Sequence, residues 1–273
     1  MTFSEKLKTI WGKNNSLVCV GLDPDLSRFP DHFKNVSDSI FQFNKAIIDA
    51  THDLVCAFKP QIAYFSAEGA EKQLEQTIDY IKKNYPHTPI ILDAKRGDIG
   101  STAQKYAIEA FERYGVDAVT VNPYLGYDSV QPFLSYKDRG TILLCRTSNP
   151  GAGDIQDIEV DGEPLYMRVA RLASEHWNTN NNCLLVVGAT WPSQMSEIRR
   201  ITGNMPFLVP GVGAQGGDVE TMVKSGQTND GTGMIISSSR GVLYASSGGD
   251  FAEAARDAAL ELRDEINTYR KKV

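Results

Sequence analysis

Eight short apolar runs recur along the chain, and each is typical of a strand that is covered on both faces. They span residues 17–20, 56–58, 90–92, 118–121, 142–145, 184–187, 207–209 and 234–236. Segments with helical spacing of apolar residues lie between them, at residues 40–53, 67–83, 102–114, 129–137, 165–177, 192–201, 219–225 and 251–269. Eight strand–helix units in 273 residues predict an α/β fold, a TIM (β/α)8 barrel, as a single domain over residues 1–273. An open doubly wound sheet is the structural alternative.

Two segments stand outside this alternation. Residues 2–8 are polar with amphipathic spacing, which predicts a short N-terminal helix rather than a signal peptide. Residues 149–164 are acidic and rich in turn-forming residues, and Asp161-Gly162 favours a hairpin turn. We interpret residues 149–164 as an insertion between the fifth strand and its helix. No linker rich in Pro, Gly or Ser divides the chain.

Composition excludes several classes of protein. A net charge of -6 argues against binding to nucleic acid or to an anionic membrane surface. No run of eighteen apolar residues is present, so no membrane span is expected. None of the cysteines forms a C-x-x-C pair and no histidine lies at a predicted strand end, which disfavours a metal site. The cysteines are expected to be reduced core residues of a cytoplasmic protein: Cys19, Cys56, Cys145 and Cys183.

The most informative segment is residues 90–98, where an apolar strand runs into three ionisable residues, Asp93, Lys95 and Asp98. Asp93 and Lys95 are two residues apart, so in a regular strand their side chains point to the same face. Charged side chains are rarely buried unless they are paired or take part in chemistry. The cluster is therefore suited to holding a reacting charge or transferring a proton, and a structural ion pair is the alternative.

Polar residues also follow other predicted strands. They are Asp23 after the first strand, Lys59 after the second, Ser148 after the fifth and Arg240 after the eighth. The carboxyl ends of barrel strands meet at one mouth, where catalytic side chains lie. The sequence therefore predicts that two lysines and three acids converge there. Considered alone, Asp23 is better explained as a turn residue before Pro24.

Residues 210–217 contain the pattern G-x-G-x-x-G. A dinucleotide fingerprint would open the first strand–helix–strand unit, whereas this pattern follows the seventh strand, where barrels commonly bind phosphate. Backbone N–H groups around Gly213, the amide of Gln215 and the guanidinium of Arg240 are the candidate phosphate ligands. The alternative is a plain loop with a surface arginine.

With these motifs in place, the chain resembles the orotidine 5'-phosphate decarboxylase family. The matching blocks occur in order at residues 21–23, 58–61, 92–102, 210–217 and 239–241, and span nearly the whole chain. The block at 92–102 is specific. The length and residues 149–164 resemble the longer, type 2 subfamily, while the surroundings of Arg240 and residues 225–233 match less closely.

The resemblance implies decarboxylation of orotidine 5'-phosphate to uridine 5'-phosphate and CO2, the last step of de novo pyrimidine nucleotide synthesis. It implies a homodimer that works without cofactor or metal. By analogy, Lys95 protonates C6 of the pyrimidine and Asp93 lies beside the departing carboxylate. Lys59 and Asp23 hold the ribose hydroxyls and align the charges.

The resemblance also assigns the remaining candidates. Asp98 and Thr102 would cross the dimer interface into the partner's site. Gln215, Arg240 and the backbone at Gly213 would grip the phosphate, and Ser148 would link the pyrimidine to the loop of Gln215.

The chemistry fits these residue types. Loss of CO2 leaves a carbanion at C6, and a fixed ammonium can stabilise that charge and then protonate it. We favour this stabilisation over stress in the ground state. The nearest alternative is a sugar-phosphate decarboxylase or an aldolase of the same barrel suprafamily, such as hexulose-phosphate synthase, which would use Mg²⁺. Residues 99–102 and the context of Lys59 favour the nucleotide enzyme. A silent nucleotide-phosphate binding module is the alternative from another class.

Overall fold

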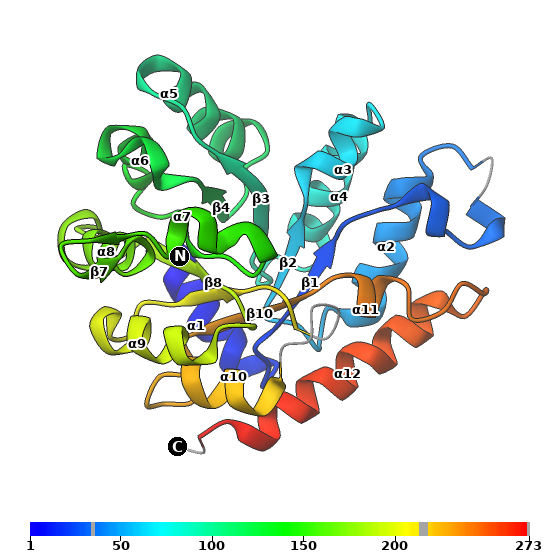
Figure 1. Cartoon of the computed structure of the whole chain (residues 1–273). Coiled ribbons are helices and arrows are strands. Elements are labelled where there is room, and N and C mark those ends of the chain that lie inside the picture. The colour runs from blue at the N-terminus through cyan, green and yellow to red at the C-terminus, as the bar shows by residue number, and fades with distance from the viewer. Residues whose placement is uncertain (34–35, 213–217, 272–273) are drawn as a thin grey trace.

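The computed structural model describes residues 1–33, 36–212 and 218–271 (Figure 1). In these residues eight parallel strands form one sheet, in the order β2-β1-β10-β9-β8-β5-β4-β3. They are β1 (Val18–Leu22), β2 (Ala57–Pro60), β3 (Ile91–Arg96), β4 (Ala118–Val121), β5 (Gly140–Arg146), β8 (Cys183–Val187), β9 (Phe207–Val209) and β10 (Met234–Ser238). Parallel bridges from Phe58 to Ile90 and from Gln61 to Asp93 join the two outer strands. The sheet therefore closes into the predicted (β/α)8 barrel of a single domain, and the open doubly wound sheet is excluded.

Helices surround the barrel on its outer side (Figure 1). The α-helices are α1 (Phe3–Lys13), α2 (Ser39–Thr51), α3 (Ile62–Ala67), α4 (Glu71–Asn84), α5 (Gly100–Ile108), α6 (Tyr127–Leu134), α7 (Gly153–Gln156), α8 (Leu165–Arg171), α9 (Pro192–Thr202), α10 (Val219–Gly226), α11 (Arg240–Leu243) and α12 (Phe251–Tyr269). Two π-helical segments, η3 (Glu109–Arg113) and η6 (Leu172–Trp177), extend α5 and α8. Within the described residues, four 3-10 turns complete the helical elements: η1 (Leu26–Arg28), η2 (Asp31–Phe33), η4 (Pro123–Leu125) and η5 (Pro150–Ala152).

The prediction of one continuous helix over residues 67–83 is wrong for the first turn of that range. A separate helix, α3, ends at Ala67, and α4 begins only at Glu71. Gly69 lies between them with φ +61°. A left-handed residue cannot continue a right-handed helix, and glycine adopts this conformation without a steric penalty.

The barrel strands are buried along most of their length, which is why their sequences read as continuous apolar runs. Every residue of β1, β2, β4, β8 and β9 is buried. At the amino-terminal end of the barrel, α1 packs against the starts of β4 and β5. A Cβ added to Gly140 would lie 2.5 Å from the ring of Phe3, and Lys6 pairs with Asp117 at 2.9 Å. The opposite, carboxyl end of the strands is left for the loops that carry the polar residues.

Residues 149–164 hold η5, α7 and a small antiparallel hairpin of β6 (Glu159–Val160) and β7 (Glu163–Pro164). Asp161 and Gly162 both have positive φ angles, of 55° and 78°, so the predicted hairpin turn is confirmed. The cysteines are free and buried, also as predicted. Within residues 1–33, 36–212 and 218–271, we find no helix with the length and apolarity that crossing a bilayer requires.

Candidate active site

Four charged side chains meet at the carboxyl ends of β1, β2 and β3. Asp93 lies at the centre: its Oδ2 is 3.1 Å from Nζ of Lys59, and its Oδ1 is 2.6 Å from Nζ of Lys95. Nζ of Lys59 is also 3.9 Å from Oδ1 of Asp23. The structure thus brings together two lysines and two of the three acids that the sequence placed at this mouth.

The inner part of this cluster is withdrawn from water. The side chains of Lys59 and Asp93 are 6% and 9% exposed, whereas that of Lys95 is 48% exposed. Burial alone would raise the pKa of Asp93, but the ammonium groups of Lys59 and Lys95 hold that pKa well below its usual range. Burial alone would lower the pKa of Lys59, but Asp93 and then Asp23 raise it above its usual range. Both Asp93 and Lys59 are therefore charged at neutral pH.

The backbone that presents Lys95 is not a regular strand. The prediction that Lys95 and Asp93 lie together is confirmed, but regular strand alternation is not the reason for it. The register of β3 against β4 shifts between Leu92 and Arg96. Lys95 has a φ of +46°, in the left-handed region, which costs a residue with a side chain roughly 1–2 kcal/mol. The ammonium reaches Asp93 because of this irregular backbone.

Thr120 holds this irregular segment, although it is not among the site residues that the sequence predicted. Its Oγ1 accepts hydrogen bonds from the backbone N–H groups of Ala94 and Lys95, each at 2.9 Å. It also donates to Oδ1 of Asp93 at 2.9 Å. The available signal was a hydroxyl residue within the apolar run 118–121.

Asp98 and Thr102 do not join the cluster of their own chain, which corrects the expectation that three acids converge. Among the described residues, Asp98 forms no ion pair with Lys95. Its carboxylate instead accepts the N–H of Ile99 at 2.8 Å. Thr102 is exposed in the first turn of α5. Both residues follow β3, which ends at Arg96.

The other predicted substrate ligands follow β5 and β10. Ser148 packs closely against the end of β8, since a Cβ added to Gly188 would lie 2.8 Å from its Cβ. Arg240 begins α11, is exposed, and has no ion-pair partner among the residues that the structure describes. Gly213 and Gln215 lie outside the described residues, so their predicted positions stay predictions.

Arg146, at the end of β5, anchors the insertion beside Ser148. Its side chain is 1% exposed, and it forms an ion pair with Asp157 at 3.1 Å. Its guanidinium carbon lies 4.1 Å from the centroid of the Trp191 ring. Gln156 of the insertion accepts the backbone N–H of Thr147 at 2.9 Å. The sequence identified residues 149–164 as an insertion but not this attachment.

Tyr244, which follows β10 and α11, links this side of the mouth to the loop of Asp23. Its hydroxyl donates to the backbone carbonyl of Asp23 at 2.9 Å and accepts the N–H of Asp25 at 2.7 Å. Burial raises the pKa of Tyr244 to about 12, so the hydroxyl keeps its proton at neutral pH. The segment that begins with Arg240 is thereby tied to the loop that carries Asp23.

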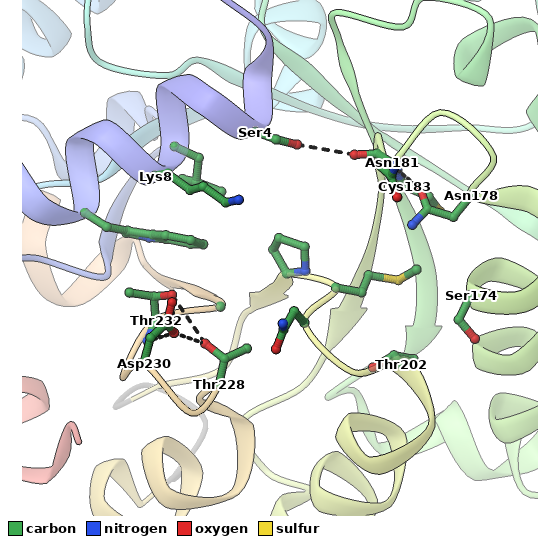
Figure 2. A pocket seen from close by; sticks show the side chains of 16 residues that line it. Ser4, Lys8, Ser174, Asn178, Asn181, Cys183, Thr202, Thr228, Asp230 and Thr232 are labelled. Carbon is green, nitrogen blue, oxygen red and sulfur yellow. Dashed lines mark hydrogen bonds between the residues drawn. The ribbon is translucent and has the colours of Figure 1, made fainter. Parts of the chain in front are cut away.

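A separate cavity of about 590 Å³ lies at the amino-terminal end of β8, β9 and β10, beside α1 (Figure 2). Asp230 in its wall accepts hydrogen bonds from Thr228 and Thr232. Lys8 points toward the cavity (Figure 2). None of the predicted site residues lines it, and this end of a barrel usually serves stability. The charged mouth is therefore the stronger candidate for chemistry.

The donor set at the mouth does not fit a resident metal ion. The carboxylate of Asp93 is already engaged by two ammonium groups and a hydroxyl. Among the described residues, no three His, Cys, Asp or Glu side chains are grouped so that they could hold a metal.

Comparison with known proteins agrees with this geometry. The model of the family described as "Orotidine 5'-phosphate decarboxylase / HUMPS family" matches residues 16–258. A protein of Cellvibrio japonicus (strain Ueda107) named orotidine 5'-phosphate decarboxylase is 71% identical over 272 residues, or 99% of this chain and 100% of that protein. A protein of the same name from Azoarcus sp. (strain BH72) is 61% identical over 270 residues, or 99% of this chain and 100% of that protein.

Among solved structures, that of Leishmania donovani OMP decarboxylase is 38% identical, with a TM-score of 0.87 and 99% of each chain covered. The family match, the two relatives and this structure each cover most or nearly all of the chain. The chain belongs to the orotidine 5'-phosphate decarboxylase / HUMPS family.

Proposed function

We propose that this protein is a carboxy-lyase that converts orotidine 5'-phosphate to uridine 5'-phosphate and CO2 in pyrimidine biosynthesis, without a cofactor. The observation that carries the proposal is the carboxylate of Asp93, buried between the ammonium groups of Lys59 and Lys95 at 3.1 and 2.6 Å. The 71% and 61% identical relatives named orotidine 5'-phosphate decarboxylase support it. Free cysteines are typical of cytoplasmic proteins, where we place the reaction.

In the proposed mechanism, the pyrimidine sits at the mouth with C6 beside Lys95. The bond from C6 to the carboxylate breaks, CO2 leaves, and the electron pair stays on C6. The ammonium of Lys95 stabilises this charge and then gives C6 a proton. Asp93 keeps the lysine oriented, and Lys59 keeps Asp93 ionised inside the protein.

Substrate binding follows from the surrounding strand ends. We assign the ribose hydroxyls to Lys59 and Asp23, and the pyrimidine to Ser148. Arg240 is exposed and free of ion pairs among the described residues, as a phosphate ligand must be before the substrate arrives. Gln215 and the backbone at Gly213 complete the proposed phosphate site. Binding energy from the phosphate would help to organise the reacting end.

We also propose that the active form is a homodimer in which Asp98 and Thr102 enter the partner's site. The absence of Asp98 from the cluster of its own chain supports this arrangement. Large apolar side chains are exposed close by, at 56% for Ile99, 75% for Tyr124 and 47% for Leu125. They follow β3 and β4, and a second copy of this chain would cover them.

The alternative is a sugar-phosphate decarboxylase or hexulose-phosphate synthase. The family description includes the abbreviation HUMPS, so the family match alone does not separate the two activities. The names of the two relatives reported above favour the nucleotide substrate. A silent nucleotide-binding module is disfavoured by the paired lysines, which phosphate binding alone does not require.

The test is turnover of orotidine 5'-phosphate, followed by pyrimidine absorbance with and without EDTA. We expect turnover that survives the chelator, and a loss of more than tenfold, about 1.4 kcal/mol, in the Lys95→Ala variant. Lys45→Ala is the matched control, because Lys45 is 41% exposed and pairs with Asp49 at 2.9 Å within α2, outside the cluster of Asp23, Lys59, Asp93 and Lys95. Binding of uridine 5'-phosphate with no turnover would favour the silent module, and loss of activity in EDTA would favour the Mg²⁺-dependent enzymes.

A further inference from the structure

We propose that Thr120 is a positioning residue for Lys95, an inference that rests on the proposed decarboxylase function. Thr120 lies in β4 and is completely buried. Its hydroxyl makes three hydrogen bonds, two as acceptor and one as donor, each 2.9 Å long. A hydroxyl has one hydrogen and two lone pairs, so the capacity of this group is fully used.

The first role of the hydroxyl is to replace a missing part of the strand ladder. Residues Leu92 and Arg96 pair with Val119 and Val121, so three residues of β3 face the single residue Thr120 of β4. In this bulge the N–H groups of Ala94 and Lys95 are bonded to the side chain of Thr120. Buried N–H groups need partners, so the bulge depends on an acceptor at this position.

The second role is to hold the carboxylate that orients the lysine. The hydroxyl donates to Oδ1 of Asp93, the same oxygen that accepts the ammonium of Lys95 at 2.6 Å. Thr120 therefore binds the backbone N–H of Lys95 directly, and it positions the amine of Lys95 indirectly because both groups bind Oδ1 of Asp93. The left-handed φ of +46° at Lys95 is held by this contact across two strands.

Loss of the Thr120 hydroxyl should slow the chemical step more than it weakens substrate binding. Without the hydroxyl, the N–H groups of Ala94 and Lys95 lose their acceptor and the backbone relaxes toward a regular strand. The amine then moves relative to C6, and misplacement of a reacting group by about 1 Å can cost on the order of a hundredfold in rate. The proposed phosphate ligands follow other strands, β9 and β10, in the sequence, so the Michaelis constant should change little.

The test compares Thr120→Val, which keeps the shape but removes the hydroxyl, with Thr120→Ser, which keeps the hydroxyl. We expect the single-turnover rate of Thr120→Val to fall by about tenfold or more, with KM within about threefold of the wild-type value. Thr120→Ser should stay within about threefold of the wild-type rate. Thr141→Val is the control, since Thr141 of β5 is also fully buried and its hydroxyl has no partner among the described residues.

A wild-type rate in Thr120→Val, or an equal loss in Thr120→Ser, would overturn the positioning role. The positioning role would also be overturned if the lower kcat/KM of Thr120→Val came entirely from a higher KM. If Thr120→Val does not fold, the comparison becomes Thr120→Ser against Thr120→Ala, which differ only in the hydroxyl, and equal rates would reject the inference. An inactive wild-type protein would instead reject the proposed function, so the two failures are distinguishable.

Discussion

Replacing Lys59 with Met tests whether the ion pairs at the barrel mouth outweigh the burial of the charges. Met keeps an unbranched apolar side chain and removes the ammonium. In the native protein that ammonium is 3.1 Å from Asp93 and 3.9 Å from Asp23, on a side chain that is 6% exposed. In the variant, Asp93 keeps Lys95, while Asp23 loses its nearest cation.

The magnitude follows from these distances. With an effective dielectric constant of about 20, the two attractions are worth roughly 5 and 4 kcal/mol. Desolvation of each buried ion costs several kcal/mol, so only part of that sum remains as stability. Removing one partner of a buried pair typically costs about 3–5 kcal/mol. Because Lys95 still neutralises Asp93, we expect the lower end, a loss of about 3 kcal/mol in the free energy of unfolding.

The assay is urea unfolding followed by circular dichroism, at one protomer concentration for all variants because a dimer's stability depends on concentration. Lys45→Met is the control, since this pair with Asp49, whose side chains are 41% and 35% exposed, should contribute less than about 1 kcal/mol. A Lys59→Met protein within about 1 kcal/mol of the wild type, or more stable, would refute the reasoning. In that case the cost of desolvating Lys59 cancels its attraction to the two carboxylates.

Three further predictions concern the phosphate, the dimer and acid. Arg240→Ala should weaken binding of uridine 5'-phosphate by about 1.5–3 kcal/mol in calorimetry and leave uridine binding unchanged; an equal effect on both ligands would place the arginine elsewhere. Mixing Asp98→Ala with Lys95→Ala protein should restore about a quarter of wild-type activity through hybrid dimers with one intact site, and no recovery despite subunit exchange would indicate self-contained sites. The lowered pKa of Asp93 means that its stabilising contribution is present above about pH 4 and is lost as the pH falls through its folded-state value. The melting temperature of the wild type should therefore fall more steeply below about pH 4 than that of Asp93→Asn, and parallel curves would contradict the assignment.

Local sequence determined most of the architecture of this protein. A parallel strand covered on both faces must be apolar throughout, so eight such runs marked the eight barrel strands. Charged residues directly after those runs marked the mouth, because strand ends in a barrel share one edge. The same rule predicted that Lys59 and Asp93 lie at one mouth, where the structure shows them in contact. Asp161-Gly162 likewise defined its turn through backbone preferences that act within two residues.

Tertiary structure decided how the mouth is arranged inside. Alternation along a strand assumes a regular ladder, but the ladder at Lys95 is interrupted by a hydroxyl that is 25 residues away in the chain. Whether Asp98 joins the cluster of its own chain also depends on the path of the backbone after β3, which no periodicity in the sequence records. The attachment of residues 149–164 to Arg146 joins a strand end to a loop side chain in the same way. Such contacts join different elements of the barrel, so each depends on geometry that hydrophobic patterning does not contain.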